Sequence, residues 1–394
     1  MKKEKSFETM AIHAGEKEGK AKNALNNPIY MTSTFTFDNL EHAEKTFSFK
    51  TDDYVYTRGN NPTLKVLEKK IAALENGCDA VAFASGMAAI SSTILSEVGP
   101  GEKVLAHKVL YGSSHNFIKN MLPENKIESK LLDFTDLNKL EKNISEKVSV
   151  VYFETPANPN LDIIDIKKVT KIAHSYNAKV IVDNTFATPF FQNPLNFGAD
   201  IVIHSATKYI SGHGDVVAGI AIANDQDYIH KLKFDYMAEY GGVLSPFNAW
   251  LLLRGLKTLS LRMREHEKNA IKIAKYLKNN SKVKKVYYPG FEERNDYEII
   301  KKQMSGYGAM ISFELKGDIQ KSKKLVNSLN LFQLAVSLGD TESLIEYPFA
   351  MTHRDYSEEE LKKLGLSKKL LRISVGLETA KDLIDDLKQA FSKI

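Results

Sequence analysis

The residues with the clearest chemical potential lie in one polar turn, Ser205–Asp215, which follows an apolar run that predicts a buried strand. The hydroxyls of Ser205 and Thr207 suit phosphate oxygens. Two glycines further along the turn allow the backbone to approach a ligand closely. At the mouth of a strand, the amine of Lys208 could form a Schiff base with a carbonyl cofactor. Most lysines in proteins are simply exposed to solvent, so the other polar residues must decide whether Lys208 is a cofactor-binding lysine or a surface lysine.

Polar residues also stand at the ends of other predicted strands. Ser85–Met87 opens a helix, where free N–H groups and the helix dipole predict an anion site. Asp183 could keep a pyridine nitrogen protonated, or it could cap a turn. Tyr111 could stack on a cofactor ring, or it could be a partly buried tyrosine. Glu154 and Asn158 flank a proline-containing turn and could be turn residues only.

Apolar runs alternate with helical patterns through the first two thirds of the chain. This alternation is typical of a mostly parallel sheet with helices on both faces. Ligands of such sheets bind beyond the carboxyl ends of the strands, where the polar residues above are found. The expected strands are 81–84, 104–106, 148–153, 180–183, 201–203 and 216–223, and the expected helices include 88–98, a segment ending at 121, and 166–176.

Three segments are expected along the 394 residues, which are too many for one ordinary core. Residues 1–60 lack a regular helical period and form an arm that must lean on the body or on a neighbouring subunit. Residues 61–252 form the large domain. Residues 253–394, reached through a long helical region at about 246–279, form a smaller α+β domain with strands at 308–315 and 371–375 and helices near 319–329 and 379–392.

The helix that opens the large domain has clear boundaries. Asn61 can cap it, Pro62 fits its first turn, and Gly77 is expected to end it. Its apolar face repeats at helical spacing through Leu64, Leu67, Ile71 and Leu74.

Composition excludes several classes of protein. Hydrophobic residues at 43% and charged residues at 26% are those of a soluble globular protein. A single cysteine, Cys78, excludes a disulfide framework and a cysteine-rich metal site, and no metal is expected. The net charge is +5, but the lysines are scattered, which favours a solvated surface over a nucleic-acid partner. Without an apolar leader or a run of about 18 apolar residues, we expect no signal peptide, no membrane span and a cytoplasmic location.

Together, the polar strand ends supply each part that a pyridoxal 5'-phosphate (PLP) site needs: an anion cradle, a carboxylate, an aromatic ring and a lysine. Over essentially its full length, the chain also resembles the Cys/Met-metabolism family of PLP-dependent trans-sulfuration enzymes. The motifs that carry the resemblance are Tyr56–Arg58, Ser85–Ala89, Glu154–Pro159, Val182–Thr185, Ser205–Tyr209 and Arg372–Glu378.

The resemblance implies an aspartate-aminotransferase-like fold (fold type I) and a homotetramer built as a dimer of dimers. It implies that Lys208 forms the Schiff base, Asp183 pairs with the pyridine nitrogen and Tyr111 stacks on the ring. Gly86, Met87, Ser205 and Thr207 would hold the phosphate, together with Tyr56 and Arg58 from the neighbouring subunit. Arg372, assisted by Ser337 and Asn158, would bind the substrate carboxylate.

Within that family, Lys208–Asp215 and Leu334–Asp340 are most similar to γ-lyases of methionine. The expected reaction is α,γ-elimination of methionine or homocysteine to 2-oxobutanoate, ammonia and a thiol. Lys208 would move the Cα proton and Tyr111 would protonate the thiolate. Cystathionine enzymes tend to carry a glutamate at the position of Val336, whose apolar side chain suits a thioether methyl group.

Alternatives remain open because several positions depart from the methionine γ-lyase pattern. Ser113 stands where a cysteine is usual, and Met237 and Ala238 stand where a Lys-Asp pair is usual. The alternatives are a cystathionine γ-lyase and a γ-replacement transferase that uses an acylated homoserine (a cystathionine γ-synthase or O-acetylhomoserine sulfhydrylase). A catalytically silent protein of this fold is disfavoured because the lysine, aspartate, tyrosine and arginine are all present.

Overall fold

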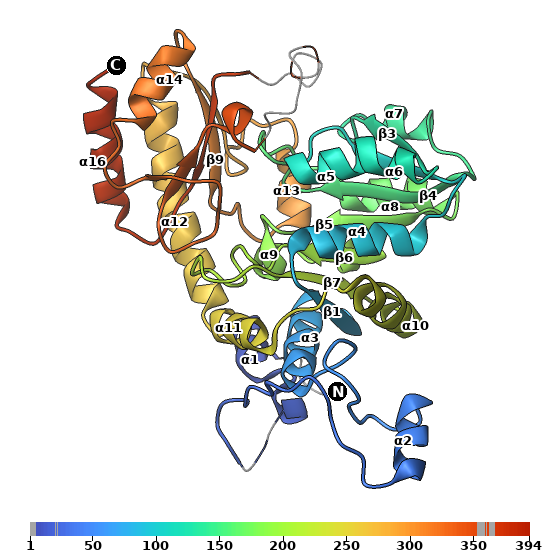
Figure 1. Ribbon diagram of the computed structural model, residues 1–394. Helices are drawn as coiled ribbons and strands as arrows, with labels where there is room; N and C mark the ends of the chain where they lie inside the picture. The colour runs from blue at the N-terminus through green and yellow to red at the C-terminus, as the bar shows by residue number, and fades with distance from the viewer. Residues whose placement is uncertain (1–4, 20, 22, 353–358, 360, 362–366) are drawn as a thin grey trace.

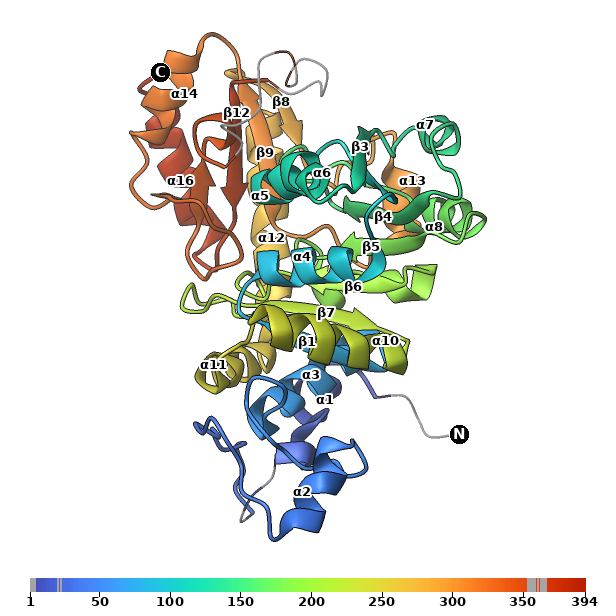
Figure 2. The same cartoon turned by 45° about the vertical axis from the view of Figure 1, so that its right-hand side comes forward.

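The computed structural model describes residues 5–19, 21, 23–352, 359, 361 and 367–394. Two sheets organise these residues, a seven-stranded sheet in the first part and a five-stranded sheet in the second (Figure 1). The α/β class expected from the sequence is therefore confirmed. The N-terminal segment lies at the far end of the large sheet from the C-terminal sheet (Figure 2).

The large sheet has the order β1-β7-β6-β5-β4-β2-β3, and only β7 runs antiparallel to its neighbours. Its central strands are buried on both faces, as expected for continuous apolar runs under helices. The strands are β1 (Asp79–Phe83), β2 (Lys103–His107), β3 (Glu128–Leu132), β4 (Val148–Glu154), β5 (Lys179–Asp183), β6 (Ile201–His204) and β7 (Gly219–Ala223).

Helices pack on both faces of this sheet. One face packs against α4 (Gly86–Glu97), η2 (Phe117–Met121), α10 (Gln226–Lys231) and η4 (Leu232–Ala238). The other packs against α3 (Pro62–Glu75), α7 (Leu137–Glu141) and α8 (Ile166–His174). Short elements complete the layer: α5 (Gly112–Asn116), α6 (Leu122–Glu124), α9 (Thr188–Phe191) and η3 (Pro194–Phe197).

The C-terminal sheet has the order β10-β11-β12-β9-β8, and only its β10–β11 pair is parallel. The strands are β8 (Val283–Tyr287), β9 (Met310–Leu315), β10 (Gln333–Leu334), β11 (Leu344–Glu346) and β12 (Leu370–Ser374). Around them lie α12 (Leu259–Lys278), α13 (Tyr297–Gln303), α14 (Ile319–Val326), η5 (Pro348–Ala350) and α16 (Ala380–Phe391).

The sequence missed the strands β3, β8, β10 and β11. β3 and β8 carry exposed or half-exposed polar residues along much of their length, so neither has the apolar run that marked the other strands. β10 and β11 have only two and three residues, too few for a pattern to be recognised. The single helical region expected at 246–279 is two helices, α11 (Pro246–Leu256) and α12, separated at Lys257 and Thr258. A Cβ atom at Gly255 would lie 2.4 Å from the carbonyl oxygen of Ser211, so α11 packs directly on the turn that carries Lys208.

The N-terminal segment contains helices that its sequence pattern did not predict, namely α1 (Phe7–His13), η1 (Glu16–Gly19) and α2 (Leu40–Phe47). α1 and α2 are short, so each offers too few turns for a periodic pattern to be recognised. α1 packs on the body of the chain: Ala11 is buried against α3, and the buried Lys70 of α3 donates hydrogen bonds to the carbonyls of Ala11 and Ile12 at 3.1 and 2.5 Å.

The predicted boundaries of α3 are correct at its start and shifted by one residue at its end. Asn61 accepts a hydrogen bond from the Thr63 N–H at 2.9 Å, and Pro62 is the first helical residue. Asn76, with φ of 61°, takes the left-handed position that was expected of Gly77. Gly77 serves a packing role instead, because a Cβ there would lie 2.4 Å from Ile222.

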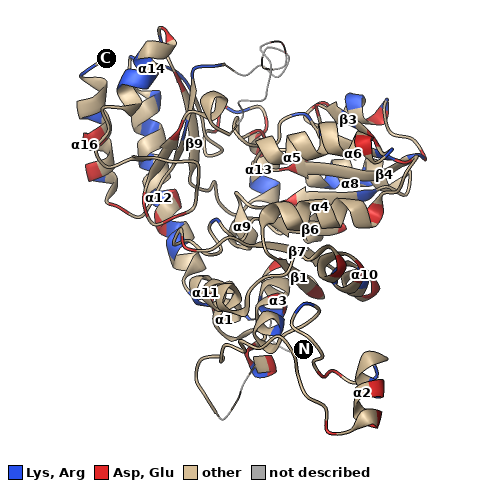
Figure 3. Cartoon of the chain, in the orientation of Figure 1, with Lys and Arg blue, Asp and Glu red and all other residues tan. Residues whose placement is uncertain are grey.

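Charged residues of both signs are spread over the helices of both parts of the molecule (Figure 3). In the part of the chain that the structure describes, no helix combines the length and the apolar character needed to cross a membrane. The division into 1–60, 61–252 and 253–394 stays a prediction, and its second boundary lies inside α11.

Candidate active site

A cavity of about 250 Å³ lies where the carboxyl ends of the large sheet meet the C-terminal domain. The cavity is lined by every residue that was expected to contact the ring, the aldehyde or the phosphate of PLP within its own subunit. Tyr56 and Arg58, which were expected to act in the neighbouring subunit, lie elsewhere. The predicted residues in the lining are Gly86, Met87, Tyr111, Asn158, Asp183, Ser205, Thr207, Lys208 and Arg372.

Lys208 follows β6 and projects into this cavity. Its Nζ donates a hydrogen bond of 3.3 Å to Oγ of Ser337, which comes from the C-terminal domain. Burial lowers the pKa of the Lys208 amine, and the nearby Arg372 guanidinium lowers it further. A lysine with a lowered pKa supplies the neutral amine that attack on a carbonyl requires.

The anion cradle lies at the start of α4. Ser85 caps this helix by accepting a hydrogen bond from the Ala88 N–H at 3.1 Å. A Cβ atom at Gly86 would lie 2.9 Å from Cβ of Ser205, so only glycine lets the helix start and the Lys208 turn come together. Thr207 lines the cavity, but its hydroxyl is already engaged by the backbone of Ala218, to whose carbonyl it donates at 3.1 Å.

Two carboxylates stand side by side at the end of the sheet, because Glu154 of β4 and Asp183 of β5 are paired in register. Oδ1 of Asp183 accepts a hydrogen bond from the Thr185 N–H at 2.9 Å. Glu154 accepts one from the Tyr111 N–H at 2.8 Å. Burial raises the pKa of both carboxyl groups, and the charge of Asp183 raises that of Glu154 further. Glu154 therefore does more than form a turn, because its carboxyl group holds the backbone of Tyr111. Its position at a strand end beside Asp183 is the feature from which a site residue could have been predicted.

Arg372 lies on β12 and reaches the cavity from the opposite side. Its NH1 donates to Oδ1 of Asn158 at 2.8 Å, and its NH2 donates to the carbonyl of Ser337 at 3.3 Å. The structure therefore brings together the three residues expected to bind a carboxylate. It adds Glu346, whose Oε2 lies 3.1 Å from NH2 of Arg372. Nε of Arg372 has no hydrogen-bond partner among the described residues, which leaves a donor for a ligand.

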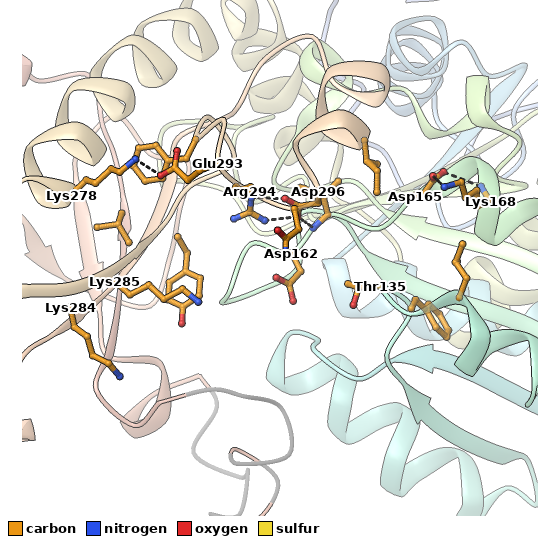
Figure 4. A pocket seen from close by; sticks show the side chains of 18 of the residues that line it. Thr135, Asp162, Asp165, Lys168, Lys278, Lys284, Lys285, Glu293, Arg294 and Asp296 are labelled. Atoms are coloured by element: carbon orange, nitrogen blue, oxygen red, sulfur yellow. Dashed lines mark hydrogen bonds and ion pairs between the residues drawn. The ribbon is translucent and has the colours of Figure 1, made fainter.

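The segment that carries Asn158 is held by the C-terminal domain. Arg294 forms a two-point ion pair with Asp296 and donates to the carbonyl of Leu161 at 2.8 Å, while Asp296 accepts from the Ile163 N–H at 3.1 Å. Figure 4 shows Arg294 and Asp296 beside Asp162 in the second cavity, of about 800 Å³, that they line. These contacts hold the loop after β4 in place and so position Asn158, the hydrogen-bond partner of Arg372.

Other predicted residues do not line the Lys208 cavity in this chain. Tyr56 and Arg58 are exposed and line a separate groove between the N-terminal segment and η4. There Arg58 donates to the carbonyl of Ala238 at 3.3 Å. Ser113 is exposed on α5. Their assigned roles stay predictions.

The comparisons with known proteins agree with this geometry. A sequence profile described as "Cys/Met metabolism PLP-dependent enzyme" matches residues 8–392. The chain belongs to this family. It is 48% identical over 388 residues to an L-methionine gamma-lyase of Fusobacterium nucleatum subsp. polymorphum, with 98% of each chain covered. It is 42% identical to a cystathionine beta-lyase of Lactococcus lactis subsp. cremoris, covering 98% of this chain and 99% of that protein.

A solved structure supports the fold and the cofactor. A putative O-acetylhomoserine (thiol)-lyase from Campylobacter jejuni matches with a TM-score of 0.94 and 33% identity, covering 98% of this chain and 100% of that one, and it contains N'-pyridoxyl-lysine-5'-monophosphate. The predicted family, fold type I and PLP dependence are confirmed. Among the described residues, no group of three or more His, Cys, Asp and Glu could hold a metal ion.

The chemical groups that line the cavity of this PLP-dependent enzyme fit the cofactor. The carboxylate of Asp183 is an acceptor for the pyridine nitrogen, and Lys208 supplies the amine. The N-terminus of α4 and the hydroxyl of Ser205 supply hydrogen-bond donors for the phosphate. Glu154, Thr185, Phe186, Val217 and Thr352 also line it and were not assigned site roles from the sequence.

Proposed function

We propose that this protein is a PLP-dependent carbon–sulfur lyase that carries out α,γ-elimination of L-methionine or a related sulfur amino acid such as homocysteine. The products would be 2-oxobutanoate, ammonia and a thiol. The observation that carries the proposal is the meeting of Lys208, Asp183, Tyr111 and Arg372 around one cavity with the apolar Val336 at its wall. The names of the methionine gamma-lyase and cystathionine beta-lyase relatives support the same reaction class.

Bound PLP would supply an electron sink for the carbanion at the substrate Cα. Lys208 would bind the cofactor, then accept and return the Cα proton through its amine. Asp183 would hold the proton of the pyridine nitrogen, and Gly86, Met87, Ser205 and Thr207 would contact the phosphate. Nε of Arg372 would donate to the substrate carboxylate while Asn158 and Ser337 hold the guanidinium in place.

Tyr111 would serve as the acid for the departing thiolate. Its backbone is held by Glu154, and its ring borders the cavity, with the residue 39% exposed. Val336 presents an apolar side chain to the same cavity, and such a wall favours an uncharged thioether end over the distal amino and carboxyl groups of cystathionine.

The assembly and location belong to the proposal as well. Tyr56 and Arg58 would contact the phosphate of the neighbouring subunit, in a homotetramer built as a dimer of dimers. Their exposure and their position in a groove separate from this chain's own cavity support that role. Ser113 would lie near the substrate. The N-terminal segment would form the arm of a chain divided into three parts. The enzyme would act in the cytoplasm, without a nucleic-acid or membrane partner.

The test is a keto-acid release assay that compares methionine, homocysteine, cystathionine and cysteine. Release of 2-oxobutanoate from methionine or homocysteine is expected, and turnover of cystathionine alone would make the enzyme a cystathionine γ-lyase instead. Incorporation of added sulfide or cysteine with an acylated homoserine, faster than elimination, would identify the γ-replacement transferase. Lys208→Ala is the control, and it should lose both activity and the absorbance of the lysine-bound cofactor.

A further inference from the structure

A buried hydroxyl on the C-terminal sheet contacts the loop that carries Asn158, and the reaction outlined above gives it no role. Ser312 is the third residue of β9 and is fully buried, with 0% of its surface exposed. Its Oγ donates a hydrogen bond of 2.6 Å to the carbonyl of Pro159, in the loop that follows β4 of the large sheet. A buried hydroxyl is costly unless it is hydrogen-bonded, and Ser312 finds its partner in a segment far away in the chain.

Strand register places Ser312 directly beside Arg372. The two residues are paired across β9 and β12, and Arg372 is paired in turn with Glu346 of β11. Residues directly opposite each other on antiparallel strands present their side chains on the same face of the sheet. Ser312, Arg372 and Glu346 therefore form one row across the C-terminal sheet, and two members of this row contact the loop after β4.

The two contacts fall on consecutive residues of that loop. NH1 of Arg372 donates to Oδ1 of Asn158 at 2.8 Å, and Ser312 donates to the carbonyl of the very next residue. The ion pair described above holds the loop farther along, at the carbonyl of Leu161 and the N–H of Ile163. Of these three contacts with the loop backbone, the one made by Ser312 is the nearest to Asn158. It therefore has the most direct effect on where the amide of Asn158 meets the guanidinium.

We propose that Ser312 is a positioning residue for substrate binding, because its hydrogen bond to Pro159 places Asn158 where it can hold Arg372. Asn158 contacts NH1 of the guanidinium, while Glu346 pairs with NH2. Loss of the Ser312 bond loosens the first contact and leaves the ion pair to set the orientation of the guanidinium. This proposal rests on the proposed function, in which Arg372 binds the substrate carboxylate, and it is independent of the sulfur end of the substrate.

The experiment compares the steady-state kinetics of the wild-type holoenzyme and Ser312→Ala in the keto-acid assay. KM for the amino acid should rise about fivefold, which corresponds to the loss of one hydrogen bond. Because Ser312 does not line the Lys208 cavity, kcat should stay within about twofold of the wild type. The matched control is Ser322→Ala in α14, which removes a buried hydroxyl that has no hydrogen-bond partner among the described residues and should leave KM unchanged.

A double-mutant cycle with Asn158→Ala separates positioning from a general loss of stability. If Ser312 acts through Asn158, Ser312→Ala should change KM by less than about twofold once the amide of Asn158 has been removed. An unchanged KM in the single variant Ser312→Ala would overturn the proposal. Equal changes in KM with and without the amide of Asn158 would overturn it as well, because they would show that the two residues act independently.

Binding of norleucine makes the result independent of turnover, because this amino acid has the carboxylate of methionine and a methylene group in place of the sulfur. Its Kd, measured from the change in visible absorbance of the holoenzyme, should also rise about fivefold in Ser312→Ala. A Kd equal to that of the wild type would contradict the role of Ser312. If the wild type releases no keto acid from any sulfur amino acid, the proposed function fails, while the norleucine titration still decides whether Ser312 positions the carboxylate site.

Discussion

Glu346 and Arg372 face each other across neighbouring strands and form an ion pair of 3.1 Å in which both side chains are at most 3% exposed. Thr352 donates a hydrogen bond of 3.0 Å to the other carboxylate oxygen of Glu346. The arginine proposed to bind the substrate carboxylate is thus already neutralised before any ligand arrives. A substrate carboxylate must share this guanidinium with Glu346.

Glu346→Gln should therefore weaken the free enzyme and strengthen substrate binding. Removing one member of a buried pair leaves the other charge uncompensated, and we expect a loss of about 3 kcal/mol of stability. A substrate carboxylate would restore neutrality, so the KM for the amino acid should fall roughly threefold while Asn158 and Ser337 keep Arg372 in place. Urea unfolding and steady-state kinetics measure the two effects. The control is Glu314→Gln on the same sheet, which removes a buried carboxylate that pairs with Lys284 and should leave KM unchanged. A higher KM in Glu346→Gln than in the wild type would contradict the charge argument.

Glu154 should act as a neutral hydrogen-bond acceptor, because burial and the charge of Asp183 raise its pKa well above the usual range. Glu154→Gln keeps an oxygen for the Tyr111 N–H and should retain near-normal cofactor affinity and kcat. Glu154→Ala removes the 2.8 Å hydrogen bond and should weaken cofactor retention about tenfold. Equilibrium dialysis against PLP measures this difference. Equal losses in both variants would show that the charge of Glu154, not its hydrogen bond, is what matters.

Shared active sites can be tested by subunit complementation. Lys208→Ala removes the proposed cofactor lysine, and Arg58→Ala removes the proposed phosphate contact to the neighbour. In a randomised mixture of the two inactive variants, a hybrid dimer has one intact site, so about a quarter of wild-type activity should return. The control is the same mixture without the dissociation and reassembly step. Failure of the reassembled mixture to gain activity would place Arg58 outside the neighbour's site.

Lys70 should make stability depend on pH. Burial lowers its pKa to about 8, below the ordinary value of 10.5, so the unfolded chain binds more protons than the folded protein between these values. The contribution of Lys70 to the free energy of unfolding should accordingly rise as pH increases through this window. Relative to Lys70→Met, the wild type should gain about 1 kcal/mol between about pH 7.5 and 9.5, allowing for solvent screening. Urea unfolding of both proteins across this range provides the measurement, and parallel pH profiles would show that Lys70 is not the responsible group.

Local patterns were sufficient for much of the fold. The apolar runs of β4, β5 and β6 predicted a parallel sheet because strands covered by helices on both faces have no polar face. They were insufficient for β3 and β8, whose polar residues are compatible with a loop until the neighbouring strand supplies their hydrogen bonds, and for β10 and β11, which have only two and three residues. The close packing of Gly255 in α11 on the backbone of Ser211 joins two segments that are distant in the chain, so no local pattern contains it.

By itself, the sequence indicated the family and the cofactor through its motifs. It grouped Lys208, Asp183 and Tyr111 as candidates because residues at the carboxyl ends of parallel strands converge on one edge of the sheet, whereas Arg372 was a candidate through the resemblance alone. Only the tertiary structure decided what surrounds these residues. Glu346 reaches Arg372 through the register of two neighbouring strands in the second sheet, and such a contact depends on the pairing of segments that lie apart in the chain.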